Sequence, residues 1–269
     1  MLISIVTPTF NSEKTIGKNA HSIVNQTYKN FEHVIIDNLS KDNTLEIVKK
    51  IYKEKELTNS LKIISEQDRG ISHAFNKGIS SCTGEVVGIL NSDDFFYSSN
   101  VLEKVAAAFT DDNILFVHGD VYFVDPVYGT NIRRPLLCPI TTTMPYNHPT
   151  MFIRKDVYIK YGIFDEKFKY AMDYALMVKF EKNIPNFREK GKYLHGDPLV
   201  TMHSGGASWM NELNSISETK QALKEFGFWN FNARKQNFYR MFRTKLKKYL
   251  TKLNLNFLVK SWRKNKWHN

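Results

Sequence analysis

The sequence has little cysteine, no long hydrophobic run and, over its last 44 residues, no acidic side chain. Two cysteines, Cys82 and Cys138, are too few for a disulfide framework and favour a reducing compartment. No apolar run reaches the roughly 20 residues that a membrane-spanning helix needs. The first residues lack the basic segment of a secretory signal peptide and soon turn polar. We therefore expect a cytoplasmic protein without a membrane span.

The net charge of +11 is concentrated at one end of the chain. Residues 226–269 contain twelve Lys or Arg, and the preceding residues carry 26 basic and 27 acidic side chains. The body is therefore close to neutral, and the basicity belongs to a C-terminal tail. With 269 residues, the chain can form one large domain or two small ones.

Short β-rich runs alternate with amphipathic helical patterns through the first 95 residues. The runs at 2–7, 31–36, 61–65 and 86–90 each end in polar residues. This alternation predicts an α/β fold with a mainly parallel central sheet flanked by helices. The carboxyl ends of parallel strands lie along one edge, where such sheets bind their ligands. We therefore expect the four polar loops to form one site.

The fourth run ends in two adjacent carboxylates, Asp93 and Asp94. Paired acids are costly to bury, and they suit a hard divalent cation that carries a diphosphate. Ser-Asp-Asp is also good turn chemistry, so a solvated turn is the alternative interpretation. The sequence has neither a Gly-x-Gly-x-x-Gly fingerprint nor a P-loop, which favours phosphate binding through a metal.

Four motifs, taken in order, resemble those of the family 2 glycosyltransferases. They are Ser4–Asn11 (SIVTPTFN), Asp37–Thr44 (DNLSKDNT), Glu66–Gly78 (EQDRGI and AFNKG) and Asn91–Asp94 (NSDD). The resemblance covers residues 1 to about 210, and it is specific as a combination rather than motif by motif. It implies the nucleotide-diphospho-sugar transferase (GT-A) fold, an inverting mechanism, and Mn²⁺ or Mg²⁺ as cofactor.

The same resemblance implies roles for the donor loops. The residues that would hold the uridine are Pro8, Thr9, Phe10, Asp37 and Asn38. Asp68 would lie near the nucleotide and the donor sugar, Asp93 near the ribose, and Asp94 on the metal.

Asp173 opens a helical pattern after the turn Gly162–Glu166. An acid there can complement the helix N-terminus. It can also act as the general base that removes the proton of an acceptor hydroxyl. The resemblance favours the base, because the family has a helix-opening acid after such a turn. Asp165 and Glu166 are the fallback bases.

Two histidines are further candidates. His203, beside a Gly-rich loop, is a candidate metal ligand, and His148 is a candidate acceptor contact. For both, the alternative is a bystander role, which is more common for lone histidines.

The composition changes after residue 211. Helical spacing aligns five apolar side chains in one stripe: Phe238, Phe242, Leu246, Tyr249 and Leu253. Lys and Arg flank the stripe, and Trp262 and Trp267 come after it. This pattern suits an interfacial helix on an anionic membrane, and the alternative is a helix packed on its own domain.

We expect a nucleotide-sugar-binding half (1–95), an acceptor-binding half (96–225) and a basic amphipathic helical extension (226–269). The predicted function is transfer of a hexose or N-acetylhexosamine from a UDP-sugar to a lipid-diphosphate-linked saccharide. The reaction would take place at the inner face of the cell membrane, during O-antigen or capsule assembly. The alternative is a non-catalytic module that binds anionic lipid or nucleic acid through its tail. The acids at the strand ends argue against nucleic acid in the cleft, because they repel phosphate.

Overall fold

A seven-stranded sheet forms the centre of the protein in a computed structural model that describes residues 1–125, 129–205 and 211–253. The described strands of this sheet are parallel except β9, which runs against both of its neighbours. Across the sheet the order is β10 (Gly191–Leu194), β6 (Phe116–Gly119), β9 (Phe152–Arg154), β4 (Val86–Ile89), β1 (Ile3–Thr9), β2 (Phe31–Asp37) and β3 (Leu61–Ser65).

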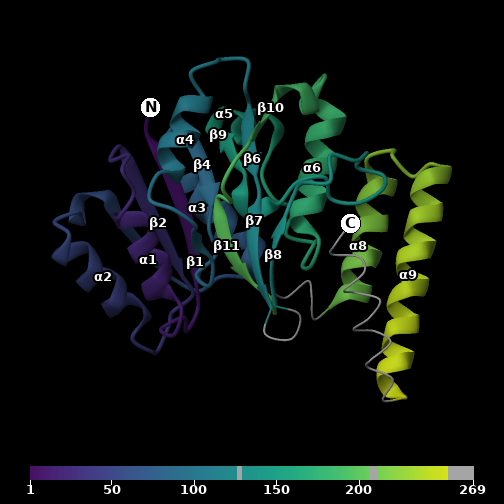
Figure 1. The fold of residues 1–269 in the computed structure, drawn as a ribbon, viewed down its shortest axis with the longest axis horizontal. Helices are drawn as coiled ribbons and strands as arrows, with labels where there is room; N and C mark the ends of the chain where they lie inside the picture. Colours follow the sequence, from purple (N-terminus) through teal and green to yellow (C-terminus); the bar gives the residue numbers. More distant parts are fainter. Residues whose placement is uncertain (126–128, 206–210, 254–269) are drawn as a thin grey trace.

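Helices cover both faces of this sheet, so the body has three layers (Figure 1). One face packs against α1 (Ile16–Val24), α2 (Thr44–Glu54) and α4 (Val101–Ala108). The other packs against α3 (Ile71–Ser81), α5 (Lys155–Tyr161) and α6 (Met172–Asn183). Short 3₁₀ turns lie between these elements: η1 (Thr58–Ser60), η2 (His148–Thr150) and η3 (Phe187–Lys190).

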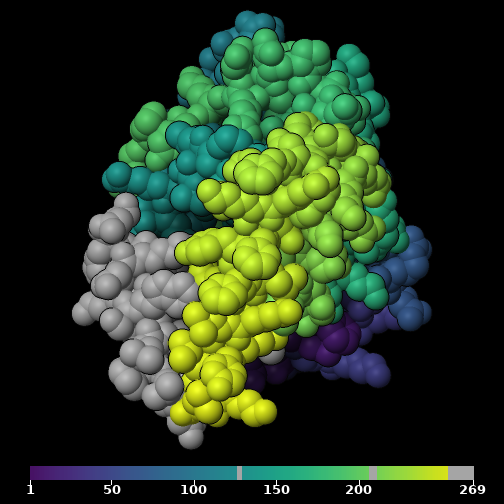
Figure 2. Space-filling view, turned by 90° about the vertical axis from the view of Figure 1, so that its right-hand side faces the viewer, coloured from purple at the N-terminus to yellow at the C-terminus, as the bar shows by residue number. Residues whose placement is uncertain are grey.

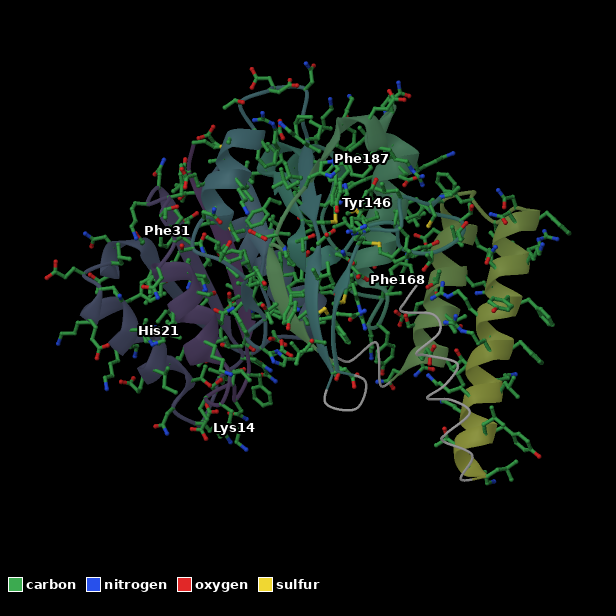
Figure 3. The ribbon with its side chains drawn as sticks, viewed as in Figure 1. Lys14, His21, Phe31, Tyr146, Phe168 and Phe187 are labelled. Atoms are coloured by element: carbon green, nitrogen blue, oxygen red, sulfur yellow. The ribbon has the colours of Figure 1, made fainter. Side chains whose placement is uncertain are left out.

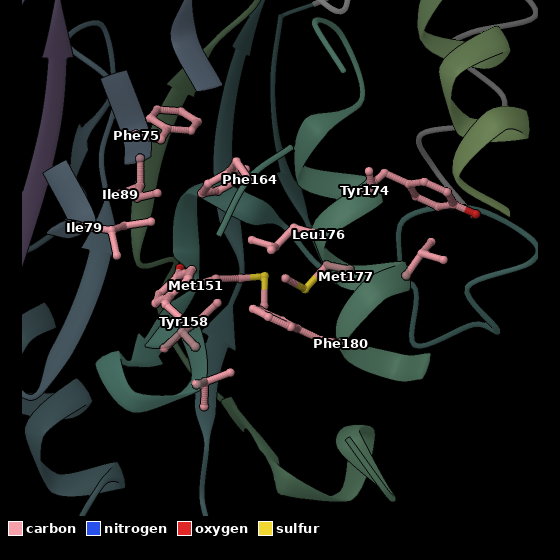
Figure 4. Close-up of a cluster of buried hydrophobic side chains, with 14 of the residues drawn as sticks. Phe75, Ile79, Ile89, Met151, Tyr158, Phe164, Tyr174, Leu176, Met177 and Phe180 are labelled. Atoms are coloured by element: carbon pink, nitrogen blue, oxygen red, sulfur yellow. The ribbon is translucent and has the colours of Figure 1, made fainter. Parts of the chain in front are cut away.

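The alternation of side chains along each strand supplies both layers of the core. In β2, Ile35 packs in the α1–α2 layer, whereas Val34 and Ile36 pack in the α3–α6 layer. Figure 4 shows the second layer, where Phe75 of α3 lies near Ile89 of β4 and aromatic and Met side chains fill the centre. Because both faces are covered, β1 and β2 are mostly apolar, and the polar residues buried within them, Ser4 and His33, are hydrogen-bonded to Glu32, Thr7 and Tyr52.

A smaller sheet lies beside the large one, and its strand β5 directly follows Asp93 and Asp94. Its order is β5 (Phe95–Phe96), β11 (Val200–His203), β7 (Val121–Asp125) and β8 (Gly129–Arg133). Phe95 pairs with Thr201 in an antiparallel register. Asp94 comes one residue before β5, so the same register brings it next to the last residues of β11.

Two helices, α8 (Glu212–Glu225) and α9 (Phe231–Lys252), form an antiparallel pair at one side of the body (Figure 1). Gly227, at a positive φ of 79°, makes the turn between them. α8 packs on α6 and contributes Ala222 and Leu223 to the core. None of the described helices is long and apolar enough to cross a membrane.

The sequence also predicts a helix capped by Asn11 or Ser12 and a single strand over residues 115–124, and the structure differs from both predictions. α1 begins at Ile16 rather than near Asn11 or Ser12, because Asn11 has a left-handed φ of 48° and its side chain accepts the N–H of Lys41. The apolar run at 115–124 is two strands, β6 and β7, which belong to different sheets.

Candidate active site

The ends of β1, β2 and β3 lie side by side, because these strands are parallel and in register. Thr9 pairs with Asp37, and Asp37 pairs with Ser65. Asp37 is fully buried, and its carboxylate accepts the hydroxyls of Thr9 (3.1 Å) and Ser65 (2.6 Å). Its second oxygen also accepts the N–H of Ser40 at 3.1 Å. Asp37 therefore fixes three loops at the site edge of the sheet.

Asn38 links the second loop to the third. Its side-chain oxygen accepts the N–H of Asp68 at 2.8 Å, and Asp68 in turn accepts the N–H of Gly70, also at 2.8 Å. Gly70, with a φ of 123°, is the N-cap of α3. Asn38 thus places Asp68 at the point where β3 turns into α3.

The first loop contains an exposed aromatic side chain. Phe10 is 59% exposed, although it comes directly after the buried strand β1. Pro8 lies half-buried beside it, and Pro8 pairs with Ile36 of β2. Such an exposed ring at a strand end is available to contact a planar base.

The two paired carboxylates have different surroundings. Asp93 is exposed, whereas Asp94 is only 2% exposed. Burial, with a further contribution from the charge of Asp93, raises the pKa of Asp94 to about 8. Hydrogen bonds from the Asn91 amide (3.2 Å) and from the backbone N–H of His203 oppose the rise. A buried acid of this kind is ionised more readily when a cation lies beside it.

His203 ends β11 directly beside Asp94. Its backbone N–H contacts the carboxylate, and its ring centroid lies 5.9 Å from that of Phe95. Among the described residues, no group of three or more His, Cys, Asp or Glu side chains could hold a metal. A cation here would therefore take one or two ligands from the protein and the rest from substrate oxygens and water. That donor set fits a Mg²⁺ or Mn²⁺ ion bound together with a diphosphate.

Asp173, the predicted base, lies in the first turn of α6 and accepts the N–H of Tyr174 at 2.8 Å. It faces His148, whose pKa burial lowers while the charge of Asp173 acts in the opposite direction. The His148 ring centroid lies 6.2 Å from that of Phe75 and 5.9 Å from that of Phe164. The structure thus brings the predicted base and the predicted acceptor histidine together.

The turn η2 lies between the region of Asp173 and the region of Asp94 and His203. It carries His148, and it contacts both β4, which leads to Asp94, and β11, which ends at His203. The turn that carries His148 therefore packs against the strands that lead to Asp94 and His203.

The two fallback bases are held in ion pairs. Glu166 receives two hydrogen bonds at 3.0 Å and one at 2.9 Å from Arg69. Asp165 lies 2.8 Å from Lys167. Partial burial opposes the shift, but the hydrogen bond and charge of Lys167 hold the pKa of Asp165 below its usual value. Both fallback acids are thus engaged by basic side chains, whereas Asp173 accepts the N–H of Tyr174.

The Arg69–Glu166 pair also joins the loop before α3 to the turn before α6, beside a cleft of about 310 Å³. One wall is the start of α3, and the other is the segment 166–170. Its lining residues are Arg69, Gly70, Ile71, Ser72, His73, Glu166, Phe168, Lys169 and Tyr170. Phe168 is labelled in Figure 3 on the side of the body where α8 lies.

Sequence reasoning missed several residues that organise the site. Ser65 is an ordinary residue at the end of the third run, and Asn91 stood inside the fourth motif without an assigned role. Arg69 stood inside one of the four motifs, but its partner Glu166 is 97 residues away. No local pattern could have paired them.

The mainly parallel sheet flanked by helices, with acidic residues at the ends of its strands, has the architecture of the nucleotide-sugar transferases of the GT-A class. The sequence model described as Glycosyl transferase family 2 matches residues 4–175. The chain belongs to this family, and both the expected family and the expected fold are confirmed.

Two curated relatives show the range of the family around this chain. The hyaluronan synthase of Pasteurella multocida is 30% identical over 86% of the chain, which spans only 24% of that protein. The Escherichia coli enzyme WfgD is 31% identical over 46% of the chain and 47% of its own length. WfgD is described as a UDP-Glc:α-D-GlcNAc-diphosphoundecaprenol β-1,3-glucosyltransferase.

Two solved structures share the fold. Staphylococcus aureus TarS, in complex with UDP-GlcNAc, has a TM-score of 0.64 and 22% identity, covering 84% of this chain and 71% of that one. The mannosyltransferase PcManGT of Pyrobaculum calidifontis, with GDP-Man and Mn²⁺, has a TM-score of 0.63 and 15% identity. That match covers 89% of this chain and 71% of that one.

Proposed function

We propose that this protein transfers a hexose or N-acetylhexosamine from a UDP-sugar to an acceptor hydroxyl, with inversion and with the help of Mn²⁺ or Mg²⁺. The observation that carries the proposal is the burial of Asp94 at the sheet edge, beside the exposed Asp93 and the backbone of His203, because a buried carboxylate is stabilised in its ionised form by a bound cation. At the same edge, Asp37 and Asp68 organise the other donor loops. The UDP-GlcNAc bound to TarS and the Mn²⁺ bound to PcManGT support this assignment.

The donor loops would bind the nucleotide through distinct contacts. Pro8, Thr9 and Phe10, with Asp37 and Asn38, form the uridine pocket in this proposal. Asp68 and Asp93 lie toward the donor sugar and the ribose. A divalent cation held by Asp94, with His203 as the adjoining candidate ligand, would neutralise the charge of the diphosphate.

Asp173 acts as the general base. It takes the proton of the acceptor hydroxyl, whose oxygen then attacks the anomeric carbon from the side opposite the leaving diphosphate. A single displacement of this kind inverts the anomeric configuration. His148 interacts with Asp173 and, in this proposal, contacts the same acceptor. Burial lowers the pKa of His148, which favours the neutral ring, and a neutral imidazole can both donate and accept hydrogen bonds with a sugar hydroxyl.

The acceptor that we propose is a saccharide carried on a lipid diphosphate, as in the name of WfgD. Such an acceptor is displayed at a membrane surface, and α9 offers a face that fits one. Seven large side chains on α9 and at its end are between 37% and 83% exposed: Phe231, Phe238, Tyr239, Phe242, Leu246, Tyr249 and Leu253. In Figure 2 α9, in yellow, faces the viewer, and ring-shaped side chains lie along its outer surface.

The opposite face of α9 is the one that packs on the body. It is small or polar: Ala233 and Thr244 are buried, Asn237 donates to the Ile216 carbonyl, and Lys247 pairs with Glu212. The predicted stripe therefore points away from the domain, so packing on the domain does not account for it. α9 has eight Lys or Arg and no acid, which favours anionic lipid over a second, equally basic copy.

We therefore propose a peripheral protein at the inner face of the cell membrane, acting in surface-polysaccharide assembly of the O-antigen or capsule kind. The division into a donor half (1–95), an acceptor half (96–225) and a basic extension (226–269) remains part of this proposal. Trp262 and Trp267 lie outside the described residues.

The test is release of UDP from UDP-glucose and UDP-N-acetylglucosamine, with and without a short-chain analogue of N-acetylglucosamine-diphosphoundecaprenol. We expect release that the acceptor stimulates, that EDTA abolishes, and that Asp94→Asn lowers by at least about 100-fold. Asparagine has nearly the same volume, so the variant should fold. Release that persists in EDTA would contradict the metal assignment, and a product that retains the anomeric configuration would contradict the mechanism.

A further inference from the structure

A single carboxylate on α8 holds the segment that leads into the base helix. Glu218 Oε1 accepts the N–H of Lys169 at 3.0 Å. Its Oε2 accepts the N–H groups of Tyr170 (2.7 Å) and Ala171 (2.8 Å). Three successive amides thus share one side chain, 47 to 49 residues away in the sequence.

These three amides lie directly before the helix that carries the base. Ala171 is the N-cap of α6, and its carbonyl accepts the first helical hydrogen bond, from Ala175. Asp173 lies two residues further, in the first turn. Amides that precede a helix have no partner within that helix, so an outside acceptor decides how the chain enters it. Glu218 is that acceptor.

The same segment forms a wall of the cleft. Lys169 and Tyr170 line it together with Arg69 and the start of α3. A shift of the 169–171 backbone would therefore move the cleft wall and the base helix together. α8 is itself fixed to the body, because it packs on α6 and buries Leu223 in the core.

We propose that Glu218 is a positioning residue that sets the place of Asp173 for the acceptor hydroxyl. The inference rests on the proposed function of Asp173 as the base. It assigns no direct contact between Glu218 and either substrate. Misplacing a catalytic group by about 1 Å can lower a rate by about 100-fold, even when the group itself is intact.

A matched control lies on the same helix. Glu225 also contacts the turn before α6, but through the side chain of Lys167 (2.6 Å) rather than through backbone amides. That pair is partly exposed on both sides, and exposed ion pairs contribute little to stability. Glu225→Gln therefore removes an acid of α8 without freeing any backbone N–H.

The experiment compares Glu218→Ala, Glu218→Gln and Glu225→Gln with the parent, using UDP-glucose, UDP-N-acetylglucosamine and the short-chain lipid acceptor. For Glu218→Ala we expect kcat for transfer to fall by at least about 10-fold, with the KM for the UDP-sugar within about twofold. Glu218→Gln keeps one acceptor oxygen and should lie between the parent and Glu218→Ala. Glu225→Gln should match the parent.

Hydrogen exchange supplies a readout that needs no acceptor. The amides of residues 169–171 should lose protection in Glu218→Ala and keep it in Glu225→Gln, while the β1 and β2 amides stay protected in both. Unchanged exchange at 169–171, or a raised donor KM with an unchanged kcat, would overturn the positioning role. If the parent itself transfers no sugar, the proposed function fails, and the exchange result still decides whether Glu218 orders this segment.

Discussion

At the scale of single residues, the three acids near α6 differ in what they contact. Glu166 and Asp165 are bound to Arg69 and Lys167, whereas Asp173 accepts one N–H from its own helix and faces His148. The sequence could place an acid at this helix start, because the turn before it is recognisable. It could not show that the other two acids are engaged, since Arg69 comes from a distant loop.

We expect Asp173→Asn to lower transfer by at least about 100-fold while leaving UDP-sugar affinity within about twofold, since the amide keeps the shape but cannot take a proton. Steady-state kinetics and calorimetric titration with UDP and Mn²⁺ provide the measurements. The matched control is Glu166→Gln, which breaks the ion pair with Arg69. If Glu166→Gln loses turnover and Asp173→Asn does not, the base is on the turn and not on the helix.

A buried histidine gives a pH-dependent prediction. Burial lowers the pKa of His118 to about 4, and its Nδ1 has no hydrogen-bond partner within the described structure. The folded protein therefore binds this proton less readily than the unfolded chain, whose histidine has a pKa of 6.5. The resulting destabilisation is absent well above pH 6.5 and grows as the pH falls toward 4.

We expect His118→Phe to flatten the loss of stability between pH 7 and pH 5 by ~2 kcal/mol, because this penalty disappears with the ring nitrogen. Phe should fit, since His118 lies among the rings of Phe116, Tyr146 and Tyr193. Urea unfolding at each pH measures the slope, and His21→Gln, at an exposed site, is the control. Equal slopes in parent and variant would refute the assignment.

At the scale of elements, helices and strands were predictable where their partners are local. The four strands and three helices of the first 95 residues appear in the expected order. The spacing of the apolar residues within each segment is enough to distinguish a helix from a strand. The strand break at Asp120 had no local signal. Phe116–Gly119 pairs with β10, whereas Val121–Asp125 pairs with β11, and both partners come some 75 residues later.

For α9, too, the sequence predicts the helix but not which of its faces packs against the body. The spacing predicted the stripe correctly, but only the structure shows that the polar face packs on α8 and the apolar face is exposed. Removing all of residues 226–269 would therefore be a poor test of membrane docking. Phe226, Phe228 and Trp229 pack against the core, so such a deletion would strip the body as well.

Substituting the stripe is the sharper experiment. We expect Phe238→Ser, Phe242→Ser and Tyr249→Ser together to leave the protein folded and able to bind UDP and Mn²⁺, because all three side chains are more than half exposed. Sedimentation with phosphatidylglycerol vesicles should weaken by at least about 10-fold, since burial of apolar area drives interfacial binding. Ile159→Ser, at a 75% exposed position on α5, is the matched control.

Two results would count against docking through this stripe. One is unchanged vesicle binding in the triple variant. The other is a parent protein that is dimeric in solution and becomes monomeric in the variant, which would make the stripe an interface between two copies.

At the scale of the whole molecule, the excess of basic residues and the candidate active site lie in different parts of the chain. The proposed donor site lies in a body that is almost neutral, and the excess of Lys and Arg belongs to residues 226–269. The sequence alone showed this division, because it depends on composition rather than contacts. How the two parts are joined was not visible. α9 packs on α8, and α8 holds the segment before α6 through Glu218.

This segregation predicts how salt affects membrane binding. Each Lys or Arg near an anionic surface contributes roughly 1 kcal/mol, and the Debye length shortens from about 14 Å to about 4 Å between 0.05 and 0.5 M salt. We expect affinity for phosphatidylglycerol vesicles to fall by at least about 10-fold over this range. Binding to phosphatidylcholine vesicles should be weak and nearly independent of salt, because it rests on the aromatic stripe alone. Sedimentation at each salt concentration measures both, and equal binding to the two lipids at low salt would show that the basic residues do not face the membrane.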